Sequence, residues 1–307
     1  MTTRPEPDGG ELDPGLSAIM SERRQLINLA YRLLGSLADA EDVVQETYTR
    51  WYAMSRAQQE AIESPGAWLT KVAGRVCLDL LRSARVRRES YVGAWIPEPV
   101  PDRSEWISGR SPDPADRVTL DESVSMAFLV VLEEMTPAER VAFVLHDVFR
   151  YPFTEVAEIV GRTPGACRQL ASSARRRIRD SAPAQAPAAR SAEIVRSFKQ
   201  AWAAKDIEAL VALLDPEATG LADGGGLVSA VLEPINGARE IARVLVELAT
   251  LVPDLAFRER TVNGRPGLVA HLDGATVAVI ALEVVGDRIT QLWAVRNPEK
   301  LRPWTEN

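Results

Sequence analysis

Basic and hydrogen-bonding side chains concentrate near the middle of the chain, where they could bind a nucleic acid. Residues 159–179 contain six arginines and no acidic residue. Arginine and glutamine can hydrogen-bond to base edges in the major groove of DNA, whereas arginine, serine and threonine bind phosphate oxygens. The side chains with this chemistry are Thr163, Arg168, Gln169, Ser172, Arg175 and Arg176. A basic helix face that is merely solvated is the alternative interpretation.

Two helices joined by a tight turn, within residues 154–179, would position these side chains. Gly161 stands where the turn needs a positive φ, which glycine adopts without steric cost. Thr163 is a favourable N-cap, and Pro164 is tolerated at the first helical position because its missing N–H would have no partner there. The pattern predicts a helix-turn-helix whose second helix lies in the major groove of DNA.

A second basic helix is predicted at about 66–88. Residues 71–88 carry six Lys or Arg residues and one acidic residue. Cations can follow a phosphate backbone, and an aromatic ring can stack on an unpaired base. The candidate DNA-binding residues here are Trp68, Lys71, Arg75, Arg82, Arg85, Arg87 and Arg88. A core position remains the alternative for the tryptophan.

Acidic and amide side chains cluster on one face of a helix predicted at about 38–54. They are Asp39, Glu41, Asp42, Gln45 and Glu46. Acids in a first turn complement the helix dipole, which is sufficient to explain Asp39 and Glu41. Because Gln45 and Glu46 lie further along, the same face is also a candidate docking surface.

Composition and charge limit the class of protein. The 307 residues are 46% hydrophobic and 26% charged, with a formal net charge of −7, which does not suit a protein that coats nucleic acid by bulk charge. No apolar run reaches the ~20 residues of a membrane helix, so we expect a cytoplasmic protein with no membrane partner. Cys77 and Cys167 lie on apolar helical faces, so small core residues are expected rather than a metal site or a disulfide, and no cofactor is predicted.

Composition shifts predict a multidomain chain with two all-α domains and a C-terminal α+β cone. The expected segments are a disordered leader at 1–15, a helical domain at 16–90, a proline-rich linker at 91–117, a helical domain with the helix-turn-helix at 118–180, an alanine/proline linker at 181–190, and a helix-and-strand domain at 191–307. Helices come first in the last domain. Its strands are expected at about 218–221, 227–232, 256–262, 267–272, 275–284 and 288–295.

Several stretches together carry a resemblance to a known family. They are residues 39–52, 67–89 and 139–178, with WIPEP at 95–99, DGGG at 223–226 and NPEKL at 297–301. On these stretches the chain resembles an extracytoplasmic-function (ECF) sigma factor, specifically the SigJ-like group with a fused C-terminal SnoaL-like domain. The resemblance covers about 16–301.

The resemblance implies roles for the clusters described above. The acidic face of residues 38–54 would bind the coiled coil of the RNA polymerase β′ subunit. The β flap of the polymerase would be a further contact of the protein. The helix at 68–88 would read the minus-ten promoter element on an extruded base, and residues 163–177 would read the minus-thirty-five element. These roles make core RNA polymerase and promoter DNA the expected partners.

The resemblance also implies that the C-terminal domain regulates the sigma domains. The expected regulatory contacts are Trp95, Pro97, Glu98, Pro99, Asp223, Gly224, Gly225, Gly226, Asn297, Pro298, Glu299, Lys300 and Leu301. We expect WIPEP to pack near DGGG and NPEKL to modulate polymerase binding. A stiff linker and a frayed terminus are the alternatives for WIPEP and NPEKL.

Enzymatic chemistry in the last domain is the alternative function, since SnoaL-like folds include polyketide cyclases and ketosteroid isomerases. Proton transfer would need a carboxylate or an imidazole inside a pocket. The candidates are Asp223, His271 and Glu283, although a structural histidine with satisfied hydrogen bonds is the simpler interpretation of His271. The domain has no tyrosine to stabilise an enolate oxygen. We therefore predict no enzyme and no catalytic residue, and the alternative is a DNA-binding protein that binds or converts a small molecule there.

Overall fold

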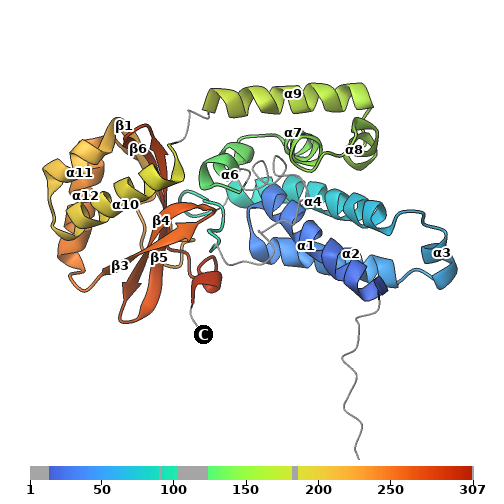
Figure 1. Ribbon diagram of the computed structural model, residues 1–307, viewed down its shortest axis with the longest axis horizontal. Coiled ribbons are helices and arrows are strands. Elements are labelled where there is room, and N and C mark those ends of the chain that lie inside the picture. The colour runs from blue at the N-terminus through green and yellow to red at the C-terminus, as the bar shows by residue number, and fades with distance from the viewer. Residues whose placement is uncertain (1–13, 90, 102–123, 182–185, 306–307) are drawn as a thin grey trace, which may run out of the picture.

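The computed structural model of the chain describes residues 14–89, 91–101, 124–181 and 186–305. Residues 1–13 of the predicted leader, Trp106 and the predicted resumption of helix near Val118 lie outside the described residues. The last two residues of the predicted leader, Pro14 and Gly15, belong instead to the first helix. Figure 1 shows a helical part on one side and a part with a sheet on the other, and the C-terminal end of the chain lies where the two meet.

The first helical region contains two long antiparallel helices and a third that packs against both. Its helices are α1 (Pro14–Leu34), α2 (Leu37–Tyr52), α3 (Arg56–Glu60) and α4 (Pro65–Glu89). The short helix α3 was not predicted. Ser55 and Gln58 cap it reciprocally, which stabilises a single turn that has no buried residue of its own.

The second helical region contains the predicted helix-turn-helix. Its elements are α6 (Met126–Glu133), α7 (Pro137–Phe143), the π-helical turn η1 (Val144–Val148), α8 (Phe153–Val160) and α9 (Pro164–Ser181). Gly161 ends α8 with φ of 71°, and the Thr163 hydroxyl accepts a hydrogen bond from the Ala166 N–H at 3.2 Å. Thr136 and Glu139 form the capping box of α7.

The two helical regions share one hydrophobic core, to which both buried cysteines belong. Helices α4 and α8 approach closely at Gly74, where a Cβ atom would lie 2.9 Å from Ile159 Cγ2. A larger side chain at this position would therefore separate the helices. No described helix is both long enough and apolar enough to cross a bilayer.

The C-terminal domain places helices before and within a six-stranded sheet, in agreement with the predicted α+β class. Its elements are α10 (Ala188–Ala203), α11 (Ile207–Leu213), β1 (Leu214–Asp223), β2 (Ile235–Asn236), α12 (Ala238–Leu251), β3 (Ala256–Val262), β4 (Arg265–Leu272), β5 (Ala275–Val285), β6 (Arg288–Val295) and the 3-10 helix η2 (Arg302–Trp304). The strand order is β2-β1-β6-β5-β4-β3. Strands β1 and β6 are parallel, and the other neighbours are antiparallel.

The strand predicted at 227–232 was wrong. Residues 224–234 form a loop, and only Ile235 and Asn236 pair with β1. Gly225 and Gly226 have φ of 63° and 72°, which turns the chain back so that the Val228 N–H bonds to the Gly224 carbonyl. Apolar side chains of this loop that suggested a strand, such as Leu227 and Leu232, are exposed instead.

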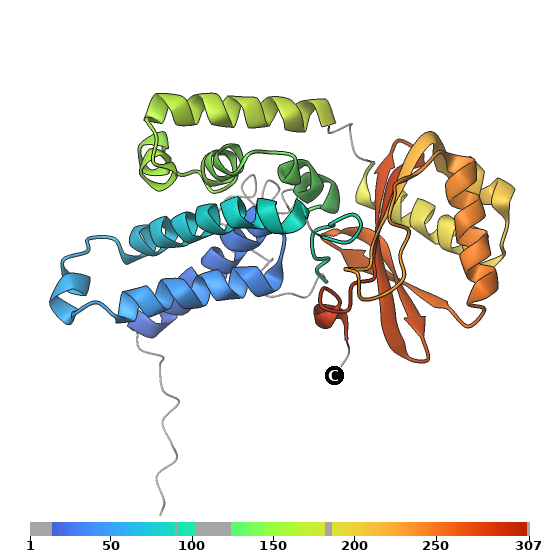
Figure 2. The ribbon, with the colours of Figure 1, turned by 180° about the vertical axis from the view of Figure 1, so that it is seen from behind.

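Both faces of the sheet are covered. Successive strand residues point to opposite faces, and in β5 both sets are apolar. Ile280 and Leu282 pack with the helices of the domain, whereas Val279 and Ala281 join a separate core with linker and C-terminal residues. The views in Figures 1 and 2 agree that the sheet lies between its own helices and the helical part of the chain.

Candidate functional site: basic helices and an interdomain junction

The outer face of α9 carries most of the side chains predicted to bind DNA. Thr163, Arg168, Gln169, Ser172 and Arg176 are exposed. The guanidinium of Arg168 also lies 5.5 Å from the centre of the Phe153 ring on α8, which holds the side chain against the preceding helix.

One predicted DNA-binding residue of this helix is engaged within the protein. Arg175 Nε donates to Asp147 Oδ1 at 2.6 Å, and its side chain is 42% exposed. The neighbouring Ser173 hydroxyl bonds to Glu139 at 2.8 Å, so α9 is anchored to the helices beneath it. These contacts fix the orientation in which α9 presents its exposed residues.

The basic helix α4 meets α8 rather than solvent along part of its length. Lys71 Nζ pairs with Glu158, and Arg75 Nη2 donates to the Glu158 carbonyl at 3.0 Å. Trp68 is half-buried and packs edge-on against Trp51, with the ring centres 5.2 Å apart. In this arrangement the first three predicted minus-ten residues contact other parts of the protein.

The remaining predicted residues of α4 lie nearer its C-terminal end. Arg82 pairs with Asp79 at 3.2 Å and is exposed. The side chains of Arg85, Arg87 and Arg88 lie outside the described residues.

The acidic face of α2 is exposed to solvent over most of its length. Glu41, Asp42, Gln45 and Glu46 are exposed, and Glu46 pairs with Arg50 one turn later. Asp39 is half-buried and lies at the start of the helix, in a cavity lined also by linker and C-terminal residues. The C-terminal domain therefore touches the end of this face without covering it.

A fully buried carboxylate, Asp223 at the end of β1, gathers the linker and the C-terminal segment. Its Oδ1 accepts from the Tyr91 hydroxyl at 2.7 Å. Its Oδ2 accepts from the Ile96 N–H at 3.1 Å and from Lys300 Nζ at 2.7 Å. Lys300 also bonds to the Ile96 carbonyl and lies 4.2 Å from the Trp95 ring centre. We call this cluster the Asp223 junction.

The glycines of the DGGG loop are required by close packing at this junction. A Cβ atom on Gly225 would lie 2.3 Å from Asn297 Nδ2, and one on Gly224 would lie 2.3 Å from the Val228 carbonyl oxygen. Gly226 packs against Val92 of the linker. The three predicted regulatory stretches, WIPEP, DGGG and NPEKL, therefore contact one another at the Asp223 junction.

The rest of the NPEKL stretch divides between buried and exposed positions. Asn297 Nδ2 donates to the Tyr91 hydroxyl at 3.1 Å, and Leu301 is buried against the sheet. Pro298 and Glu299 are exposed. The stretch is therefore anchored at both ends, unlike a frayed terminus.

The linker also binds the first helical region. Pro97 and Pro99 are buried, and the Pro99 carbonyl accepts from the Trp304 indole at 2.8 Å. Glu98 accepts from the Leu37 N–H at 2.8 Å and so caps the first turn of α2. The Trp95 ring lies against Gly35, where a Cβ atom would be 2.8 Å away.

Glu98 should make the stability of this contact depend on pH. Burial raises the pKa of its carboxyl from 4.5 to about 7, although the Leu37 N–H and Lys300 act in the opposite direction. Between these values the folded state binds more protons than the unfolded state, so this contribution to stability is lost as the pH rises through about 7. Glu98→Gln should flatten the fall in the free energy of unfolding between about pH 5 and pH 7.5, by about 2 kcal/mol. Urea denaturation of both proteins at both pH values measures this difference. If the free energy of unfolding falls equally with pH in both, the raised pKa of Glu98 is contradicted.

Asn263, in the turn between β3 and β4, was not predicted to take part in the interface. It is buried, and its amide donates to the Tyr31 hydroxyl at 2.8 Å and the Val124 carbonyl at 2.9 Å. Its Oδ1 accepts from the Val100 N–H at 3.1 Å. The Asn-Gly pair signals a turn, but nothing in the sequence signals these three distant contacts.

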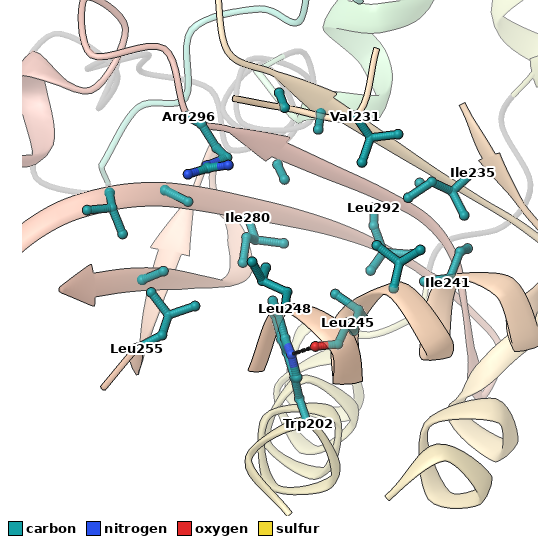
Figure 3. Close-up of a pocket in the computed structure, with 18 of the residues that line it drawn as sticks. Trp202, Val231, Ile235, Ile241, Leu245, Leu248, Leu255, Ile280, Leu292 and Arg296 are labelled. Carbon is teal, nitrogen blue, oxygen red and sulfur yellow. Dashed lines mark hydrogen bonds between the residues drawn. The ribbon is translucent and has the colours of Figure 1, made fainter. Parts of the chain in front are cut away.

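The C-terminal domain contains a cavity of about 250 Å³ between the sheet and α12. Figure 3 shows apolar side chains around it, with Arg296 and Trp202 at opposite ends. Asp223, His271 and Glu283, the candidates for proton transfer, do not line the cavity. His271 Nδ1 has no hydrogen-bond partner among the described residues, contrary to the satisfied histidine that we expected. The lining suits binding of a largely apolar molecule more than acid–base chemistry.

Comparison with known proteins agrees with this architecture. Residues 18–87 match Sigma-70 region 2, and residues 125–178 match Sigma-70, region 4. The chain is 38% identical to the ECF RNA polymerase sigma factor SigJ of Mycobacterium tuberculosis over 292 residues, covering 91% of this chain and 90% of SigJ. It is 35% identical to a probable ECF RNA polymerase sigma factor, SigI, of the same species, covering 95% of this chain and 96% of SigI.

A solved structure extends the similarity to the fold. The crystal structure of M. tuberculosis SigJ matches with a TM-score of 0.73 at 35% identity, covering 94% of this chain and 98% of that chain. The match includes the C-terminal domain as well as both helical regions. The chain therefore belongs to the ECF RNA polymerase sigma factors and carries a C-terminal helix-and-strand domain fused to its two sigma domains.

Proposed function

We propose that this sigma factor, acting in the cytoplasm, binds core RNA polymerase through α2 and promoter DNA through α4 and α9, and that its C-terminal domain sets how the sigma domains are arranged. The Asp223 junction carries the regulatory part of the proposal. One buried carboxylate there joins β1, the linker between the sigma domains and the C-terminal segment. A change in the C-terminal domain would therefore reach the linker directly.

The acidic face of α2 is the proposed contact for the β′ coiled coil, with the second sigma domain on the β flap. Exposed acids suit a basic partner surface, and charge reversal there replaces attraction with repulsion. We expect the variant with Glu41→Arg and Asp42→Arg to bind core polymerase at least about tenfold more weakly. Fluorescence anisotropy with labelled sigma factor measures the affinity. Glu208→Arg, on the exposed surface of α11, is the matched control and should bind normally; an equal loss in both variants would refute the assignment.

The exposed face of α9 is the proposed minus-thirty-five reader, with Arg168 and Gln169 nearest base edges and Arg176 nearest phosphate. In holoenzyme, Arg168→Ala should cost about 1–3 kcal/mol of promoter binding and relax the preference for one base. Arg176→Ala should weaken binding to all sequences and lower the salt slope by about 1. Titration of holoenzyme with promoter and scrambled duplexes at several salt concentrations separates the two effects. Identical behaviour of the variants would contradict these roles.

The contact between α4 and α8 supports a role for domain arrangement in promoter reading. Lys71 and Arg75 bind Glu158, and the Thr70 hydroxyl lies 2.8 Å from that of Tyr151. Lys71 is partly covered by α8, and Arg75 is exposed but bonded to it, so a promoter strand that binds both side chains would compete with these contacts. We infer that the sigma domains separate when the minus-ten element is read, and that the junction determines how readily they do so.

A further inference from the structure

Arg296 is a cation in the wall of an otherwise apolar cavity. Apart from Arg296 and the indole N–H of Trp202, the side chains that line the cavity are apolar or glycine. The Trp202 N–H is satisfied by the Leu245 carbonyl at 2.7 Å. The guanidinium is therefore the group left to recognise a polar part of an occupant.

The hydrogen bond from Arg296 to Ser229 leaves most of the guanidinium donors available. Nη1 donates to the Ser229 carbonyl, and within the described residues no carboxylate pairs with the guanidinium. A guanidinium has five N–H donors, and a partly buried cation is stabilised by an anion. A carboxylate matches its geometry, since it accepts two parallel hydrogen bonds.

We propose that this cavity binds a small amphipathic acid, with its carboxylate at Arg296 and its apolar body extending toward Trp202 (Figure 3). The volume of about 250 Å³ lies just below the ~300–1,000 Å³ of typical ligand pockets, which selects a short aliphatic chain or a single ring. Val231 lines the cavity and is 44% exposed, so the cavity is accessible at the loop that follows DGGG.

The position of Arg296 links this site to the Asp223 junction. The backbone N–H groups of Arg296 and Asn297 both donate to the Asp223 carbonyl, at 2.7 and 2.9 Å. The Arg296 side chain holds Ser229, in the loop that begins at Gly224. A carboxylate that draws the guanidinium away from Ser229 releases that loop, so the acid is a regulatory ligand; this consequence rests on the proposed regulatory function.

Octanoate and octan-1-ol are matched probes, because they share an apolar chain and differ in charge. Isothermal titration of the full-length chain should show octanoate binding more tightly than octan-1-ol, by about tenfold. Arg296→Gln should remove this preference and leave the alcohol affinity unchanged. Arg239→Gln, an exposed arginine of α12 that pairs with Glu208, is the control and should keep the preference.

A cavity-filling variant tests the location independently of charge. Ala294 lines the cavity from β6, so Ala294→Phe should abolish binding of both probes while the far-ultraviolet circular dichroism stays unchanged. Equal affinity of both probes for the unmodified chain, no octanoate binding, or full binding to a folded Ala294→Phe variant would overturn the proposal. Because no polymerase is present, these outcomes leave the proposed polymerase and promoter contacts untouched.

Discussion

Asp223→Ala should open the junction between the linker and the C-terminal domain. The substitution removes the carboxylate that pairs with Lys300, whose side chain is 10% exposed, and it removes the acceptor of the Ile96 N–H. Removal of one partner of a buried ion pair costs about 3–5 kcal/mol. We expect the Ile96 amide to exchange with deuterium at least about a hundredfold faster, since each 1.4 kcal/mol is a factor of ten.

Two further variants separate the ion pair from a general loss of stability. Asp223→Ala combined with Lys300→Met removes both charges of this ion pair and should recover part of the protection, because the ammonium no longer has to be buried without the Asp223 carboxylate. Asp254→Ala, at an exposed position of the same domain, should leave exchange at Ile96 unchanged. If Asp223→Ala also leaves this exchange unchanged, the carboxylate does not hold the linker.

Asn263→Ala should have the second large effect, at the contact between the C-terminal domain and the helical part. Three side-chain hydrogen bonds, to Tyr31, Val100 and Val124, would be lost in a buried site. Asn263 also has φ of 51°, which alanine adopts at a cost of about 1 kcal/mol. We expect a total loss of about 4 kcal/mol in the free energy of unfolding, measured by urea denaturation.

Asn263→Gly distinguishes hydrogen bonding from backbone strain. Glycine accepts the positive φ without the steric cost but makes none of the three side-chain bonds. It should therefore lose about 3 kcal/mol, close to the loss in the alanine variant. A glycine variant as stable as the natural chain would show that the amide contributes nothing to the interface.

The sequence predicted those parts of the fold that depend on local signals. Gly161, Thr163 and Pro164 define the helix-turn-helix through their own backbone preferences and capping, so its boundaries could be inferred without tertiary information. The apolar period of 71–88 and its basic residues likewise located α4. The predicted approach of WIPEP to DGGG came from the resemblance, because no local rule relates segments more than a hundred residues apart.

The parts that could not be predicted depend on tertiary contacts. The apolar residues at 227–232 suggested a strand, but the preceding glycines turn the chain before it can pair. Lys71 and Arg75 were predicted to be exposed cations; Arg75 is exposed, but the packing of α4 on α8 brings both side chains to Glu158. One available signal was overlooked: residues 277–282 of β5 are apolar at every position, and such a run indicates a strand buried on both faces.

Run-off transcription with core RNA polymerase shows whether the C-terminal domain controls the sigma domains. The full-length chain is compared with a chain that ends after Arg190, on the same promoter template and at equal occupancy of polymerase. The helical regions have a hydrophobic core of their own, so we expect the shorter chain to retain the sigma fold, which circular dichroism checks. We expect promoter-specific transcripts from the full-length chain and a different amount from the shorter one. Equal amounts from both would contradict control of the sigma domains by the C-terminal domain.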